Sequence, residues 1–199
     1  MTFPEKLQII SDIYFGKHTQ SFSEDEIVSI EEHLQIALPI PLREFYFLFG
    51  GNSDLVKCMY YIAAPEELYV ENNILMLAKE QQNVCSYGIH LDTQKPIYID
   101  ESNNITQPMD LDIEDFLIYL LALQGTAYFP CVGKIKTESA VELETYLFRL
   151  SKTDGVRSVF CSRNGIIGVV DKSDIFLSAK NDDCMEELEN TSGLEIDYL

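Results

Sequence analysis

Residues 29–51 constrain the fold of this chain more than any other stretch. They read Ser-Ile-Glu-Glu-His-Leu-Gln-Ile-Ala-Leu-Pro-Ile-Pro-Leu-Arg-Glu-Phe-Tyr-Phe-Leu-Phe-Gly-Gly. Apolar residues recur at helical spacing on both sides of Pro39 and Pro41, and proline interrupts a helix but is tolerated in the first turn of the next one. A glycine pair is typical of a helix end. The stretch therefore predicts a helix, a Leu-Pro break and a second helix that ends at Gly50-Gly51.

The residues before this stretch predict one further helix. Apolar residues at helical spacing favour a helix over 4–15, and Gly16 follows it as a stop. Ser23 and Glu26 form a capping box, in which the serine accepts from a free N–H and the glutamate reaches back. This box starts the first helix of the pair, over about 24–35.

The spacing of apolar residues along the chain changes after Gly51. Short runs rich in aromatic and β-branched residues are typical of strands and predict an antiparallel sheet. The runs cover 55–62, 73–78, 84–91, 96–100 and, more briefly, 105–107. A strongly apolar helix follows, capped by Asp110 or Asp112 and ended by Gly125.

The last part of the chain predicts a smaller α+β unit. Leu143, Leu147 and Leu150 favour a helix over about 138–151. Asn164-Gly165 is typical of a tight hairpin turn. The remaining predicted elements are hairpin strands 157–162 and 166–171, a strand 174–178 and an acidic helix 182–190. We expect an α+β fold: N-terminal helices on a central antiparallel sheet with a closing helix in residues 1–125, and a C-terminal α+β extension in 126–199 that packs against it.

The charge is large and uneven. The 199 residues include 33 acids and 14 bases, a formal net charge of −19. Residues 18–42 and 96–133 contain no Lys or Arg, and residues 171–199 contain nine acids and two lysines. Such a field repels nucleic acid and anionic lipid and attracts basic proteins. The alternative explanation is that the acidity serves solubility alone.

The cysteines and the N-terminus predict a cytoplasmic protein. The five cysteines are far apart and form no Cys-x-x-Cys pair, so we expect reduced and mostly buried thiols. No apolar run reaches about 18 residues, and the N-terminus lacks the basic and apolar regions of a secretion signal. We expect no membrane partner.

Patterns that carry catalysis are missing from the sequence. It contains no Gly-x-Ser-x-Gly, P-loop or Gly-x-Gly-x-x-Gly motif. None of the three histidines has a second ligand at metal-binding spacing. Residues 110–115 alternate acids like a calcium loop, but Asp115 replaces the required glycine and Leu121 the bidentate glutamate. We therefore expect a protein that is not an enzyme and uses no cofactor or metal.

Several short motifs occur in a characteristic order. Ile30-Glu-Glu-His-Leu34 precedes Leu38-Pro39, Leu42-Arg43-x-Phe45-Tyr46 and Gly50-Gly51, and then come Pro65-Glu-Glu-Leu68, Tyr87-Gly88-Ile89, Lys95-Pro-Ile-Tyr-Ile99 and Phe116-Leu117. This order, over about residues 20–125, resembles the SUKH superfamily of bacterial immunity proteins and fungal regulators of cell-wall synthesis. The C-terminal part resembles the extension of longer members, which ends similarly to Gly193-Leu-Glu-Ile-Asp-Tyr198.

The resemblance implies a non-enzymatic immunity protein that binds and neutralises a bacterial toxin domain encoded nearby. A nuclease toxin must present Lys and Arg to phosphates, so an acidic surface can occupy the same patch. Acids outside the apolar stripes are the candidate toxin-binding residues: Asp54, Asp92, Glu101, Asp110, Asp112 and Asp115. The fungal members imply an alternative, an intracellular scaffold or regulatory module. An enzyme is the third possibility, which a pocket with converging polar side chains would favour.

Overall fold

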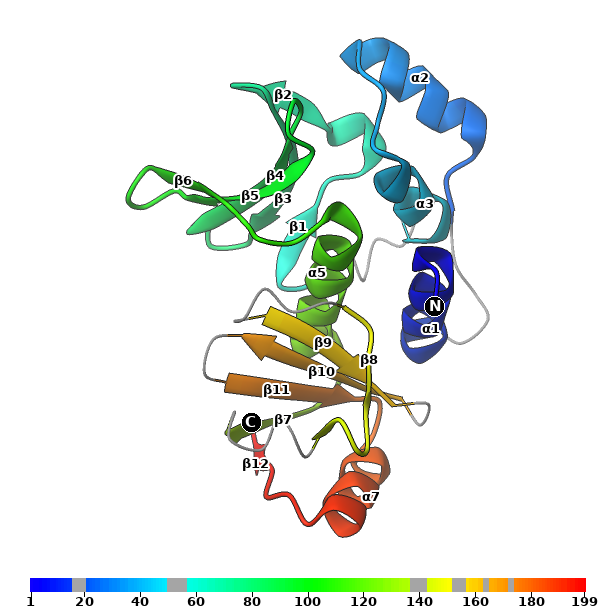
Figure 1. Ribbon diagram of the computed structural model, residues 1–199, viewed down its shortest axis with the longest axis vertical. Coiled ribbons are helices and arrows are strands. Elements are labelled where there is room, and N and C mark those ends of the chain that lie inside the picture. The colour runs from blue at the N-terminus through cyan, green and yellow to red at the C-terminus, as the bar shows by residue number, and fades with distance from the viewer. Residues whose placement is uncertain (16–20, 50–56, 137–142, 152–156, 163–164, 172–173) are drawn as a thin grey trace.

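The computed structural model describes residues 1–15, 21–49, 57–136, 143–151, 157–162, 165–171 and 174–199. The fold is α+β, as predicted, with two antiparallel sheets (Figure 1). The central helix contacts both sheets, and the first and third N-terminal helices pack beside it. No helix in the described ranges is both long and apolar enough to cross a membrane.

The three N-terminal helices confirm the opening prediction. They are α1 (Phe3–Phe15), α2 (Glu24–Leu34) and α3 (Ile40–Phe49). The capping box is present: the Ser23 side chain accepts from the Glu26 N–H, and the Glu26 side chain accepts from the Ser23 N–H at 2.8 Å. The predicted stops at Gly16 and Gly50-Gly51 lie outside the described residues.

The first sheet has strand order β1-β3-β4-β5-β6, with β2 paired to β3. Its elements are β1 (Tyr60–Ile62), a 3-10 turn η1 (Pro65–Glu67), β2 (Tyr69–Glu71), β3 (Ile74–Glu80), β4 (Cys85–His90), β5 (Lys95–Asp100) and β6 (Ile105–Pro108). The predicted strands are confirmed, although β1 begins later than expected. The sequence reasoning missed β2, whose three residues are all exposed and show no alternation.

The central helix, α5 (Ile113–Tyr128), begins where predicted and ends later than predicted. Asp112 is its N-cap, and the Asp112 side chain accepts from the Asp115 N–H at 2.8 Å. The prediction that Gly125 ends the helix was wrong, because Gly125 lies buried within the last turns. Residues 115–125 are buried all round the helix, as expected where both sides of a helix pack against protein.

The second sheet has strand order β12-β7-β11-β10-β9-β8. Its strands are β7 (Cys131–Lys136), β8 (Phe148–Arg149), β9 (Arg157–Cys161), β10 (Ile166–Asp171), β11 (Asp174–Ala179) and β12 (Asp197–Tyr198), and α7 (Asp182–Ser192) covers one end. The paired strands of the hairpin, the third strand and the acidic helix are confirmed, and β7 and β12 were missed. Asn164 of the predicted hairpin turn lies outside the described residues. Of the predicted helix over 138–151, the described residues are helical only at Leu143, and the prediction was wrong beyond it, where Phe148 and Arg149 pair with β9.

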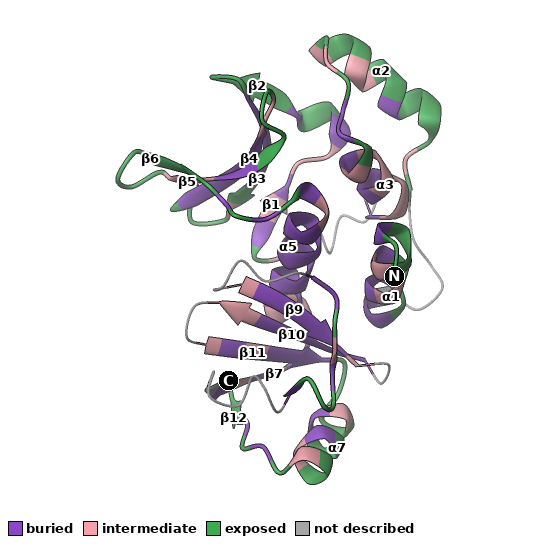
Figure 2. Ribbon diagram, viewed as in Figure 1, coloured by how far each residue is buried: buried purple, intermediate pink, exposed green. Residues whose placement is uncertain are grey.

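The buried residues form layers. One core joins α1, α3, α5 and the inner face of the first sheet to Val159 and Ile167 of the second sheet. A second core lies between the other face of the second sheet and α7, around Ile175, Leu177 and Met185. Figure 2 shows α5 buried along its length, whereas α2 and α7 are largely exposed.

None of the five cysteines forms a disulfide, and Cys85, Cys131 and Cys161 are buried. Burial raises the pKa of the Cys161 thiol to about 12. Asp182 accepts a hydrogen bond from the Cys131 thiol at 2.9 Å and raises the pKa of that thiol to about 11. These thiols stay protonated at neutral pH and behave as small buried side chains, as the sequence predicts.

Candidate functional site

The acids that the sequence indicates are spread over the first sheet and the start of α5. Asp92 is exposed in the turn between β4 and β5, where it accepts a hydrogen bond from Asn73 Nδ2 at 2.8 Å. Glu101 is exposed beyond the other end of β5 and accepts from Ser86 Oγ at 2.5 Å. Asp92 and Glu101 therefore flank opposite ends of one strand, and Asp54 lies outside the described residues.

Asp110, Asp112 and Asp115 have three different environments. Asp110 is exposed, and Asp112 is the exposed N-cap of α5. Asp115 is only 2% exposed, and its Oδ1 lies 3.4 Å from Lys6 Nζ on α1. The Asp115 carboxylate is therefore used inside the fold, and we do not retain it as a binding residue. The described candidate acids do not form a single patch.

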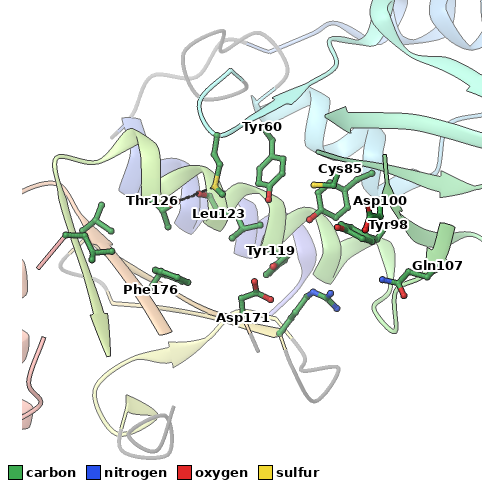
Figure 3. A pocket seen from close by; sticks show the side chains of 15 residues that line it. Tyr60, Cys85, Tyr98, Asp100, Gln107, Tyr119, Leu123, Thr126, Asp171 and Phe176 are labelled. Carbon is green, nitrogen blue, oxygen red and sulfur yellow. Dashed lines mark hydrogen bonds between the residues drawn. The ribbon is translucent and has the colours of Figure 1, made fainter. Parts of the chain in front are cut away.

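A cavity of about 850 Å³ lies between the two sheets, beside α5 (Figure 3). Its volume is within the range of roughly 300–1,000 Å³ that is typical of ligand pockets. The first sheet, α5 and the second sheet each contribute aromatic or charged side chains to its walls. The main ones are Tyr60, Tyr87, Tyr98, Tyr119, Arg157 and Asp171.

The first-sheet wall follows from strand alternation and register. Cys85 and Tyr87 share one face of β4, and they lie directly opposite Asp100 and Tyr98 of β5. The ring centroids of Tyr87 and Tyr98 are 5.6 Å apart, and those of Tyr87 and Tyr60 are 5.5 Å apart with an interplanar angle of 72°. Edge-to-face contacts of this kind are favourable, so the three rings support one another.

The opposite wall combines α5 with the second sheet. The Arg157 guanidinium carbon lies 5.9 Å from the centroid of the Tyr119 ring. Asp171 is the cross-strand neighbour of Arg157, and Figure 3 shows Asp171 and Tyr119 facing the same cavity. With Asp100, the walls carry two carboxylates and one guanidinium.

The cavity hydroxyls are protonated at neutral pH. Burial raises the pKa of Tyr60 to about 12 and that of Tyr87 and Tyr119 further. Burial also raises the pKa of the Tyr98 hydroxyl and of the Cys85 thiol, and Glu80 adds to the rise for Cys85. The tyrosines therefore offer aromatic faces and neutral hydroxyls, and the Cys85 thiol is not an activated nucleophile.

Metal binding has no support in the described ranges, where no group of three or more His, Cys, Asp or Glu side chains could hold an ion. Comparison of the chain with protein families, with curated proteins and with solved structures finds no match. The charge, surface and cavity of the chain itself are therefore the features that bear on its function.

Sequence reasoning missed the cavity, although part of its signal was present. Cys85 and Tyr87 are two residues apart, as are Tyr98 and Asp100, so each pair shares one face of a predicted strand. Aromatic residues that face a carboxylate across neighbouring strands could have indicated a polar wall. The strand alignment and the approach of Asp171 come only from the tertiary fold.

Proposed function

We propose that this protein is a non-enzymatic immunity protein of the cytoplasm that binds a basic toxin domain through an acidic surface. The observation that carries the proposal is the excess of acids. With 33 acids and 14 bases, at least 19 acids have no basic side chain to match them. The order of motifs that resembles the SUKH superfamily supports the same conclusion.

One acidic surface is α7 with the chain that follows it. Met185 and Leu188 face the core, so the acids of the helix face outward. The exposed acids of this surface are Asp182, Asp183, Glu186, Glu187, Glu195 and Asp197. An exposed surface of one sign speeds the encounter with an oppositely charged partner and rejects acidic ones.

A second acidic surface is α2. Ile27 is the buried residue of this helix, and Glu24, Asp25, Glu26 and Glu32 are exposed. Glu24 and Glu31 are partly neutralised, because Arg43 donates to Glu24 and, at 3.0 Å, to Glu31. Val28, 38% exposed, lies among these acids and gives the surface an apolar contact as well. A basic partner with an apolar centre, as a nuclease domain can present, fits such a surface.

The test is co-expression with the toxin domain encoded beside the gene. We expect the protein to protect the cells and to form a complex whose affinity falls as salt rises. If cells die equally fast with and without the protein, and no complex forms at low salt, the proposal fails. Pull-downs that recover several housekeeping proteins instead would favour a scaffold.

Two charge-reversal variants locate the surface. The first double variant, Asp183→Lys with Glu186→Lys, reverses two charges on α7. The second, Asp25→Lys with Glu32→Lys, makes the same change of charge on α2. We expect one double variant to weaken the complex by at least about tenfold, and the other to weaken it only through slower encounter. If both double variants have equal and small effects on affinity, the interface lies elsewhere on the molecule.

A further inference from the structure

The tyrosine-lined cavity between the two sheets contains none of the acids that form the two acidic surfaces. We propose that this cavity is the anchor site for a guanidinium side chain of the protein partner, which enters between the first sheet and β9–β10. This inference rests on the proposed function, since it names how a basic partner is held once charge has brought it close. Under this proposal, the cavity determines which partner is held, and the acidic surfaces determine how fast the partner is encountered.

The aromatic walls favour a planar cation. Tyrosine faces attract guanidinium groups, which stack on them while still donating hydrogen bonds at their edges. The chain contains an internal example, because the Arg157 guanidinium already lies over the Tyr119 ring. Tyr98, which is partly exposed, provides a further face on the opposite wall.

The charge of the cavity favours a cation over an anion. Asp100 and Asp171 are both partly exposed and line the cavity together with Arg157, which leaves the lining side chains with an excess of one negative charge. Asn103 donates to the Asp100 carboxylate from its backbone at 3.0 Å and from its side chain at 2.9 Å, and these bonds lower the pKa of Asp100. Asp100 is therefore held ionised and oriented, and carboxylate oxygens can accept additional donors.

The size of the cavity suits a side chain with part of its backbone. A volume of about 850 Å³ exceeds that of one arginine side chain, so flanking residues of the partner can enter the mouth. Arginine is among the residues that most often carry the binding energy of an interface when a pocket buries them. Tyr60, Tyr87 and Tyr119, each at most 6% exposed, are held by packing in the two walls that such an anchor would contact.

The experiment uses N-acetyl-arginine amide as the probe and N-acetyl-citrulline amide as its neutral isostere. The full chain contains 11 tyrosines and no tryptophan, so NMR signals of isotope-labelled tyrosines report directly on the cavity. We expect saturable shifts at Tyr98 and Tyr119 with the arginine probe, and about tenfold weaker binding of the citrulline probe. Equal binding of the two probes, or no saturable shift with either, overturns the proposal.

Matched variants distinguish binding in the cavity from a general attraction of the probe to negative charge. Asp171→Asn should weaken the arginine probe about tenfold, whereas Glu71→Gln, the same charge change on the exposed strand β2 away from the cavity, should leave it unchanged. Tyr98→Leu removes an aromatic face at a partly exposed position and should also weaken the probe. If Glu71→Gln weakens the probe as much as Asp171→Asn, the attraction is not specific to the cavity and the proposal fails.

Binding of the toxin distinguishes this inference from the proposed function. If the toxin binds wild type and Asp171→Asn equally well, the cavity is not the anchor site and the immunity proposal stands. If the arginine probe binds but no toxin complex forms, the immunity proposal fails and the cavity remains a guanidinium site.

Discussion

Gly125 lies where α1, α5 and β11 meet. A Cβ atom at this position would be 2.7 Å from Ser178 Oγ and 2.8 Å from Tyr14 Oη. Tyr14 Oη donates to the Leu121 carbonyl at 2.6 Å, and Ser178 Oγ donates to the Ile167 carbonyl at 3.3 Å. Neither oxygen can move without weakening a buried hydrogen bond. The missing side chain therefore allows the close approach of three elements.

Gly125→Ala should destabilise the protein by about 1–3 kcal/mol, because the added methyl group overpacks this contact. Alanine normally stabilises a helix relative to glycine by about 1 kcal/mol, so helix propensity alone predicts that Gly125→Ala makes the protein more stable. Urea denaturation measures the difference. Ala127→Gly, an exposed change in the same helix, is the control and should cost only the propensity difference. A gain in stability for Gly125→Ala would contradict the steric argument.

At the scale of elements, local signals identified most helices and strands, and strand pairing decided the others. The Ser23–Glu26 box and the Leu-Pro break are complete within a few residues, so α2 and α3 followed from the sequence. Leu143, Leu147 and Leu150 are all buried, as their helical spacing suggested, yet Phe148–Arg149 is a strand. Burial was predictable there and conformation was not, because pairing with β9, the next strand along the chain, overrides the helical spacing.

The same limit applies to the candidate site. Asp92, Glu101 and Asp110 are exposed, as expected for acids outside the apolar stripes. The sequence could not show that the Asp115 side chain points inward to Lys6. That pair joins positions 109 residues apart. The cavity likewise gathers side chains from both sheets and α5, and no local pattern spans such distances.

The cap of α2 predicts a pH effect. Hydrogen bonds from the Ser23 side chain and backbone lower the pKa of Glu26 below its usual 4.5. Its stabilising contribution is therefore present above about pH 4.5 and is lost as the pH falls through the lowered folded value. Glu26→Gln should reduce the free energy of unfolding at pH 6, and the difference from wild type should shrink towards pH 3.

Glu32→Gln, an exposed change in the same helix outside the cap, is the matched control and should leave this pH dependence in place. The free energy of unfolding of the three proteins is measured by urea denaturation at each pH. A difference between wild type and Glu26→Gln that stays constant from pH 6 to pH 3 would show that the ionised cap does not stabilise the fold.

At the scale of the whole molecule, α5 belongs to both parts of the chain. The boundary expected between residues 125 and 126 falls inside this helix, which contacts α1, α3 and β5 on one side and β9, β10 and β11 on the other. Val159 and Ile167 of the second sheet belong to the same buried core as the helices of the first part. A core shared in this way couples the stability of the two sheets.

Ile167→Ala tests that coupling. Ile167 is fully buried on β10 against α5, so its truncation should cost about 2–5 kcal/mol. Because the core is continuous, the loss should appear equally in the amide hydrogen exchange of β4, which lies in the other sheet and does not pair with β10. If exchange accelerates only in β9–β11 while β4 keeps its protection, the sheets unfold separately. Equal acceleration would mean that any partner held between the sheets stabilises the whole chain at once.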